Sequence, residues 1–125
     1  MSMQTALPSP AVLAEVYRAA AQLIAERGLF RGGFSSIARS PEERCYCTVA
    51  AIRVAAGVAP DDDGHPVAEA AIRRLAPMVD PAVINSDPVE RVAAWNDRPE
   101  RTTCEVVATL NAAAEDAEGD GRHGQ

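Results

Sequence analysis

Lysine is absent from this chain of 125 residues, and all 12 basic side chains are arginine. Aromatic residues make up only 4% of the sequence, whereas alanine occurs 25 times. Alanine lets helices pack closely but buries little surface per residue, so we expect one small domain of modest stability. Abundant alanine together with arginine in place of lysine is typical of proteins encoded by GC-rich genomes.

Several other features are also missing from the sequence. The apolar run within residues 40–57 is too short to cross a membrane, and this stretch carries charges. The first residues lack the charged and apolar regions of a signal peptide. The three cysteines do not form the pattern of a secreted disulfide framework. We therefore expect a cytoplasmic protein with reduced thiols.

The net charge of −6 is unevenly distributed. Three consecutive aspartates at residues 61–63 contribute half of it, and residues 115–125 contribute the other half. The remaining acidic and basic residues balance, although arginine is in local excess between Arg27 and Arg53. Because the chain lacks a broad basic face, nucleic-acid binding is disfavoured.

The first predicted helix spans residues 10–27. Ser9 is a suitable N-cap, Pro10 fits the first helical position, and Gly28 is expected just past the end. One face carries a continuous apolar stripe, which should face the core. The stripe consists of Leu13, Val16, Tyr17, Ala20, Leu23 and Ile24.

A second helix, between Ser40 and Gly57, is expected at the centre of the fold. Ser40 and Glu43 form a capping box at its start, Pro41 fits the first helical position, and Gly57 follows its end. Two nearly opposite faces are apolar, which predicts burial on both sides. These faces comprise Cys45, Val49, Ile52 and Ala56 on one side, and Cys47, Ala50 and Val54 on the other.

Further helices are predicted after the aspartate turn. Pro66 starts one, which Pro77 should end or kink near Leu75. Residues 80–84 can form a single helical turn.

Two more helix starts follow along the chain. Asp87 caps a short helix that runs to about Trp95, and a capping box of Thr102 and Glu105 opens the last helix.

The predicted fold class is therefore all-α, a compact single-domain bundle of four main helices plus one or two short helical turns. Residues 1–118 form the helical domain. Residues 119–125 form a polar tail that we expect to be disordered.

Four motifs follow one another in the chain. They are Arg-Gly-Leu-Phe-Arg-Gly-Gly-Phe at residues 27–34, Cys-Thr-Val-Ala-Ala-Ile at 47–52, Ala-Trp-Asn-Asp at 94–97, and Arg-Thr followed by Glu-Val-Val at 101–107. Their order resembles a family of small uncharacterised actinobacterial helical proteins with a Cys-containing central helix and a Trp-Asn-Asp turn. Ala50 stands where that family has glycine. The resemblance implies the helical fold and carries no activity.

The most site-like cluster is Trp95, Asn96, Asp97 and Arg98. Together with Cys47 it could line a ligand pocket between the central helix and this turn. In the alternative, which we favour, Trp95 fills the core while Asn96 and Asp97 bind backbone groups.

A second candidate site would hold an anion. Arg31, Gly32, Gly33, Arg39 and Arg44 offer guanidinium groups and free backbone N–H donors. The segment matches no phosphate-binding loop, and two neighbouring glutamates would repel an anion.

No metal or cofactor is expected. Cys45 and Cys47 point to different sides of a helix, and we interpret both as packing residues, although a nucleophilic cysteine stays an alternative. The remaining candidate zinc ligands lack zinc-site spacing; they are Cys104, His65 and His123. The aspartate turn at residues 61–64 does not match a calcium loop.

No catalytic constellation is recognisable, so catalytic residues stay unassigned and the sequence does not decide whether the protein is an enzyme. We predict a non-catalytic cytoplasmic helical protein that acts through protein–protein interaction or self-assembly. Its partner would be another protein or a second copy, and neither nucleic acid nor a membrane is expected. The alternative is a small enzyme or small-molecule-binding protein with its pocket between the central helix and the Trp95–Asn96–Asp97 turn.

Overall fold

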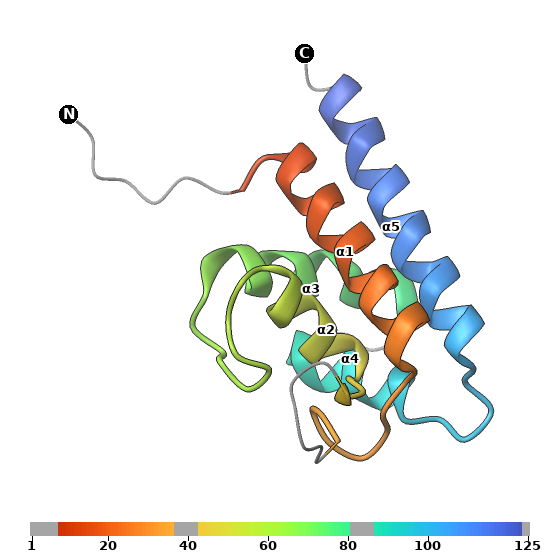
Figure 1. Ribbon diagram of the computed structural model, residues 1–125. Helices are drawn as coiled ribbons and strands as arrows, with labels where there is room; N and C mark the ends of the chain where they lie inside the picture. Colours follow the sequence, from red (N-terminus) through yellow and green to blue (C-terminus); the bar gives the residue numbers. More distant parts are fainter. Residues whose placement is uncertain (1–7, 37–42, 81–86, 124–125) are drawn as a thin grey trace.

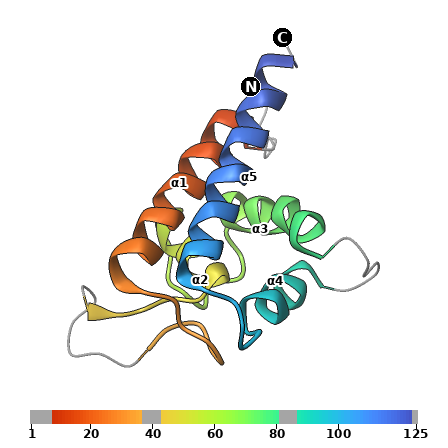
Figure 2. The ribbon, with the colours of Figure 1, turned by 90° about the vertical axis from the view of Figure 1, so that its right-hand side faces the viewer.

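The computed structural model describes residues 8–36, 43–80 and 87–123. These residues form five α-helices: α1 (Pro10–Arg27), α2 (Thr48–Ala55), α3 (Pro66–Val79), α4 (Pro88–Asn96) and α5 (Thr103–His123). Helices α1 and α5 lie side by side and run in opposite directions, while α2, α3 and α4 pack against one side of this pair (Figure 1, Figure 2). The predicted all-α class is confirmed.

Helix α1 has the predicted boundaries. The Ser9 hydroxyl accepts a hydrogen bond from the Val12 N–H at 3.2 Å, which satisfies one of the free donors of the first turn. At the other end, Gly28 has a φ of 92°, a value that favours glycine, and its N–H donates to the Ile24 carbonyl at 2.8 Å. The predicted apolar stripe faces the core, although Leu23 is only half-buried.

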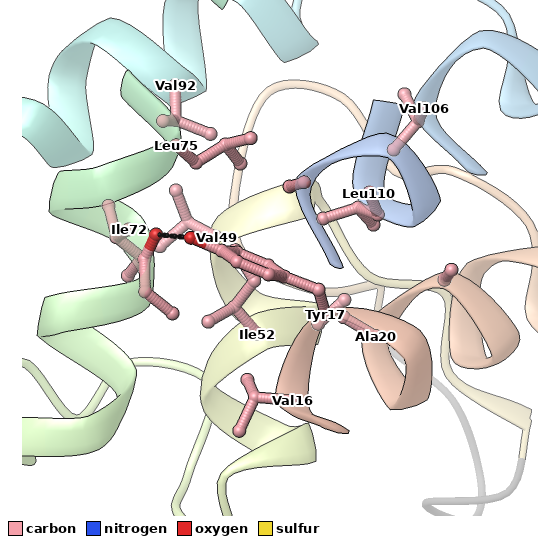
Figure 3. Packing of buried hydrophobic residues seen from close by; sticks show 14 of the residues in the cluster. Val16, Tyr17, Ala20, Val49, Ile52, Ile72, Leu75, Val92, Val106 and Leu110 are labelled. Atoms are coloured by element: carbon pink, nitrogen blue, oxygen red, sulfur yellow. Dashed lines mark hydrogen bonds between the residues drawn. The ribbon is translucent and has the colours of Figure 1, made fainter. Parts of the chain in front are cut away.

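Side chains from all five helices meet in one core. Figure 3 shows Tyr17 extending from α1 towards α3, where its hydroxyl donates a 2.6 Å hydrogen bond to the Ala71 carbonyl. Burial raises the pKa of this hydroxyl well above its ordinary value. The surrounding apolar side chains include Val16, Ile52, Ile72, Leu75, Val92, Val106 and Leu110.

The segment before α2 is not helical, which corrects the prediction that one helix continues from Ser40 to Ala56. Cys45, Tyr46 and Cys47 are extended, and α2 begins only at Thr48. The Tyr46 carbonyl accepts from the Phe30 N–H, and the Cys47 N–H donates to the Phe34 carbonyl, both at 3.0 Å. These long-range backbone bonds replace those that a helix would have made. Ser40 and Pro41 lie outside the described residues.

Helix α2 itself is central, as predicted. Every residue from Thr48 to Arg53 is buried, and Gly57 follows the helix with a φ of 95°. This part of the helix is therefore surrounded by other elements, whereas Val54 and Ala55 at its end are partly exposed.

Helix α3 continues through Pro77 to Val79, so the prediction that it ends near Leu75 is wrong, while the alternative of a kink there stays a prediction. Proline removes the N–H that would bind the carbonyl of Arg73. Both Arg73 and Pro77 are exposed, so water can satisfy that carbonyl. The single turn predicted at residues 80–84 lies almost wholly outside the described residues.

Helices α4 and α5 begin at the predicted caps. The Asp87 carboxylate accepts from the Val89 N–H at 2.8 Å, and the Thr102–Glu105 capping box is formed by reciprocal bonds of 2.9 and 3.1 Å. Helix α5 continues beyond Gly119, where we expected the polar tail to begin. Asp120 lies in this extension, and its carboxylate is 2.7 Å from an Arg74 nitrogen. Among the described residues, no helix combines the length and hydropathy that crossing a membrane requires.

Candidate functional site

Asn96, the last residue of α4, is fully buried and joins three parts of the chain. Its Oδ1 atom accepts from the Thr48 N–H at 2.8 Å and from the Thr48 hydroxyl at 2.6 Å. Its Nδ2 atom donates to the Phe30 carbonyl at 3.0 Å. The amide therefore links α4 to the start of α2 and to the loop after α1, and both ends of the side chain have partners.

Asp97 extends this connection at the surface. Its Oδ1 atom accepts from the Gly32 N–H at 3.1 Å and from the Asn96 amide at 3.0 Å. Gly32 has a φ of 85°, which side-chain-bearing residues rarely adopt. On the next residue, the Arg98 carbonyl accepts from Arg31 Nε at 3.2 Å. The loop after α1 that carries Gly32 and Gly33, called the glycine loop below, is thus held against the end of α4.

Trp95 lies at the edge of the core rather than at its centre. The indole is half-buried, and the Arg101 guanidinium lies 4.4 Å from its ring centroid. Arg101 Nε also donates to the Trp95 carbonyl at 3.0 Å. This cation–π contact fixes the turn that connects α4 to α5. The hydrogen bonds of Asn96 thus do most to hold this cluster in place, whereas the sequence drew attention to Trp95.

Cys47 is buried and caps α2. Its Sγ atom accepts a weak hydrogen bond from the Ala50 N–H at 3.4 Å, and only 3% of the residue is exposed. Burial raises the pKa of the Cys47 thiol, more than the hydrogen bonds from the start of α2 lower it. A raised pKa and low exposure favour a packing role. Cys45 lies nearby, with its thiol donating to the Arg27 carbonyl at 2.8 Å.

The residues proposed for an anion site are divided between two places. Arg31 and Gly32 bind the turn at Asp97 and Arg98, and a side chain on Gly33 would lie within 3.1 Å of the Phe30 ring. Arg44 instead lines a separate cleft with residues that follow α2. Arg39 lies outside the described residues.

The sequence did not reveal the role of Arg53. This arginine of α2 is only 1% exposed, and it pairs with Glu69 of α3 through Nε and Oε2 at 3.1 Å. Its Nη1 atom donates to the Pro60 carbonyl at 3.3 Å, and the Phe34 ring centroid is 5.4 Å from its guanidinium. A lone arginine on an otherwise apolar helix, followed by a glutamate in the first turn of the next helix, is the signal that could have predicted this pair.

Several clefts in the described part of the chain are open to solvent, and two of them lie close to α2. One, with a volume of about 310 Å³, lies between α1 and α2, and its lining comprises Ala19, Gln22, Leu23, Glu26, Val54 and Ala55. The other, of about 340 Å³, lies between the loop after α1 and the turn after α2. Within the described ranges, no group of three or more histidine, cysteine, aspartate or glutamate residues could hold a metal ion.

The fold and its buried polar centre define an all-α domain in which α4, α2 and the glycine loop are joined by one asparagine. The chain belongs to a family of unknown function, DUF6197, which matches residues 8–116. This agrees with the expectation of an uncharacterised family over most of the chain. The comparisons with curated proteins and with solved structures found no match.

Proposed function

We propose that this protein is a non-catalytic helical binding protein, and that the groove between α1 and α2 receives a basic amphipathic helix of a partner protein. The observation that carries the proposal is the lining of this groove. Ala19 and Leu23 of α1 face Val54 and Ala55 of α2, which leaves a strip of apolar surface open between two helices. Amphipathic helices bind in grooves of this kind through apolar side chains on one face.

The charge of the protein favours a basic partner over a second copy. Glu26 lies at the rim of the groove, and its carboxylate accepts from the Gln22 amide at 2.9 Å. The whole chain carries a net charge of −6, so two copies repel each other, whereas a basic partner is attracted. Lysine or arginine beside the apolar face of a partner helix would complement Glu26.

The proposal is tested with a synthetic helical peptide that carries leucine at positions i, i+3, i+4 and i+7 and lysine on its other face. Binding is measured by fluorescence anisotropy with the purified protein. We expect saturable binding, and weaker binding of a second peptide in which glutamate replaces lysine. Absence of binding by both peptides would contradict the proposed groove.

A matched pair of variants shows whether the peptide occupies the groove. Ala19→Arg places a long cation in the groove, whereas Ala112→Arg makes the same change at an exposed position on α5. Alanine and arginine are both good helix formers, so both variants should fold. We expect binding to be lost in Ala19→Arg and retained in Ala112→Arg. Equal binding by the two variants would contradict docking between α1 and α2.

Self-assembly is the other occupant to test. Sedimentation at increasing protein concentration should give a constant mass close to that of the monomer. A dimer that Ala19→Arg dissociates and Ala112→Arg leaves intact would mean that a second copy, rather than a basic partner, fills the groove.

The alternative function, a small-molecule pocket between α2 and the Trp95 turn, is tested by Asp97→Asn. Asp97 accepts two hydrogen bonds within the fold, so we expect the substitution to cost about 1 kcal/mol of stability. Peptide binding by the folded protein should not change. Unchanged melting together with loss of a bound ligand would favour the alternative.

The free state of Cys45, Cys47 and Cys104 supports a further part of the proposal, a cytoplasmic location.

A further inference from the structure

A second cleft, which shares no lining residue with the groove between α1 and α2, carries two charged side chains. It has a volume of about 340 Å³ and lies between the loop after α1 and the turn after α2. Phe34 and Pro60 supply apolar surface, and Arg44 and Asp61 supply one charge of each sign. Ser35 completes the lining.

Buried Arg53 fixes both apolar walls of this cleft. Its guanidinium lies 5.4 Å from the centroid of the Phe34 ring and donates to the Pro60 carbonyl at 3.3 Å. The backbone of Phe34 is held separately, because its carbonyl accepts from the Cys47 N–H at 3.0 Å. Phe34 still exposes 39% of its surface, which is high for so large an apolar residue. The cleft is therefore preformed, as small-molecule sites usually are.

The two charged side chains of the cleft have no partners in the described part of the chain. No ion pair joins Arg44 to Asp61, and neither side chain makes a hydrogen bond there. The Nε atom of Arg44 is buried, yet it donates to no acceptor among the described residues. A buried donor without an acceptor is costly, so an acceptor supplied by a ligand would be stabilising.

We propose that this cleft binds an α-amino acid with a large apolar or aromatic side chain, in its zwitterionic form. The carboxylate pairs with Arg44, the ammonium group pairs with Asp61, and the side chain packs on Phe34 and Pro60. Arginine pairs well with a planar carboxylate because its donors form a fork. Asp61 would repel a phosphate dianion, and a hydrocarbon would leave both charges without a partner.

L-phenylalanine is the probe, and isothermal titration calorimetry measures its binding. Three analogues each remove one recognised group: N-acetylphenylalanine lacks the ammonium charge, phenylalaninamide lacks the carboxylate, and glycine lacks the ring. We expect each analogue to bind about tenfold more weakly or worse, since a hydrogen bond to a charged group, or the burial of an aromatic ring, contributes on that scale. Failure of phenylalanine to bind saturably, or equal binding by glycine, would overturn the proposal.

Variants assign the two charges to their ligand groups. Asp61→Asn should weaken phenylalanine binding about tenfold, and acetylation of the ligand should then cause no further loss, because the lost pair is the same. Arg44→Gln should likewise weaken phenylalanine binding about tenfold, and replacing phenylalanine by phenylalaninamide should then cause no further loss. The controls Asp63→Asn and Arg73→Gln change the same charges outside this cleft and should bind normally. Equal losses in variants and controls would mean that net charge alone governs binding.

The circular-dichroism spectrum of each variant shows that it is folded before titration. Ala19→Arg, which blocks the groove between α1 and α2, should bind phenylalanine normally. The amino-acid site and the peptide groove can therefore fail independently of each other.

Discussion

Asn96→Ala is the substitution that we expect to be the most informative about this fold. Its side-chain oxygen accepts from both the N–H and the hydroxyl of Thr48, and both bonds are buried. Alanine would leave the two donors without a partner. Each such buried group costs about 1–3 kcal/mol, so we expect a loss of about 3 kcal/mol in the free energy of unfolding. A domain of this size has only about 5–15 kcal/mol in total.

Urea denaturation followed by circular dichroism measures this loss, and Asn111→Ala provides the control. Asn111 lies in α5, and its side chain makes no hydrogen bond in the described part of the chain. We expect its substitution to change stability by no more than about 0.5 kcal/mol. If Asn96→Ala and Asn111→Ala cost the same, Asn96 does not connect α4 to α2 in the way described.

A double-mutant cycle with Thr48→Val isolates the side-chain bond between the two residues. Valine keeps the shape of threonine and removes only the hydroxyl donor, at a cost of about 1 kcal/mol. The loss of stability in the double variant should be smaller than the sum of the two single losses by about 1 kcal/mol, because the same bond is lost only once. Strict additivity would show that the hydroxyl and the amide contribute separately.

The remaining predictions concern the buried ion pair, the thiols and the core tyrosine. Glu69→Gln should cost about 2 kcal/mol in urea denaturation, because Arg53 would stay buried without a counter-charge; no loss would mean that water compensates the arginine. Thiol labelling of the native protein should modify exposed Cys104 quickly and Cys47 only on unfolding, and rapid labelling of Cys47 would revive a nucleophilic role. Burial raises the pKa of Tyr17, so the unfolded state releases a proton that the folded state keeps, and stability should fall as the pH rises above about 10. Tyr17→Phe should cost about 1 kcal/mol at neutral pH for its lost hydrogen bond and should make this alkaline decline less steep, whereas an equally steep decline would contradict the assignment.

Local chemistry was sufficient to predict the ends of several helices. Ser9 and Gly28 set the limits of α1, and the Thr102–Glu105 capping box precedes α5, as the sequence indicated. These signals act within one helical turn, so neighbouring residues alone decide them. The burial of α2 between Thr48 and Ile52 was also predictable, because this part of the helix is almost entirely apolar.

Other features depend on residues that are far apart in the sequence. The segment at Cys45, Tyr46 and Cys47 was predicted to be helical, yet it is extended because its backbone pairs with Phe30 and Phe34. A capping signal and an apolar pattern cannot reveal a competing backbone partner at that distance.

The candidate sites show the same division. The sequence placed Asn96 and Asp97 in the most site-like cluster, but only the tertiary structure gave them Thr48 and Gly32 as partners. It likewise placed Arg44 beside Asp61 in one cleft, although the sequence had grouped Arg44 with the glycine loop. Short-range patterns determined which segments become helices. Which polar groups find partners within the described part of the fold, and which do not, was decided by contacts between segments that only folding brings together.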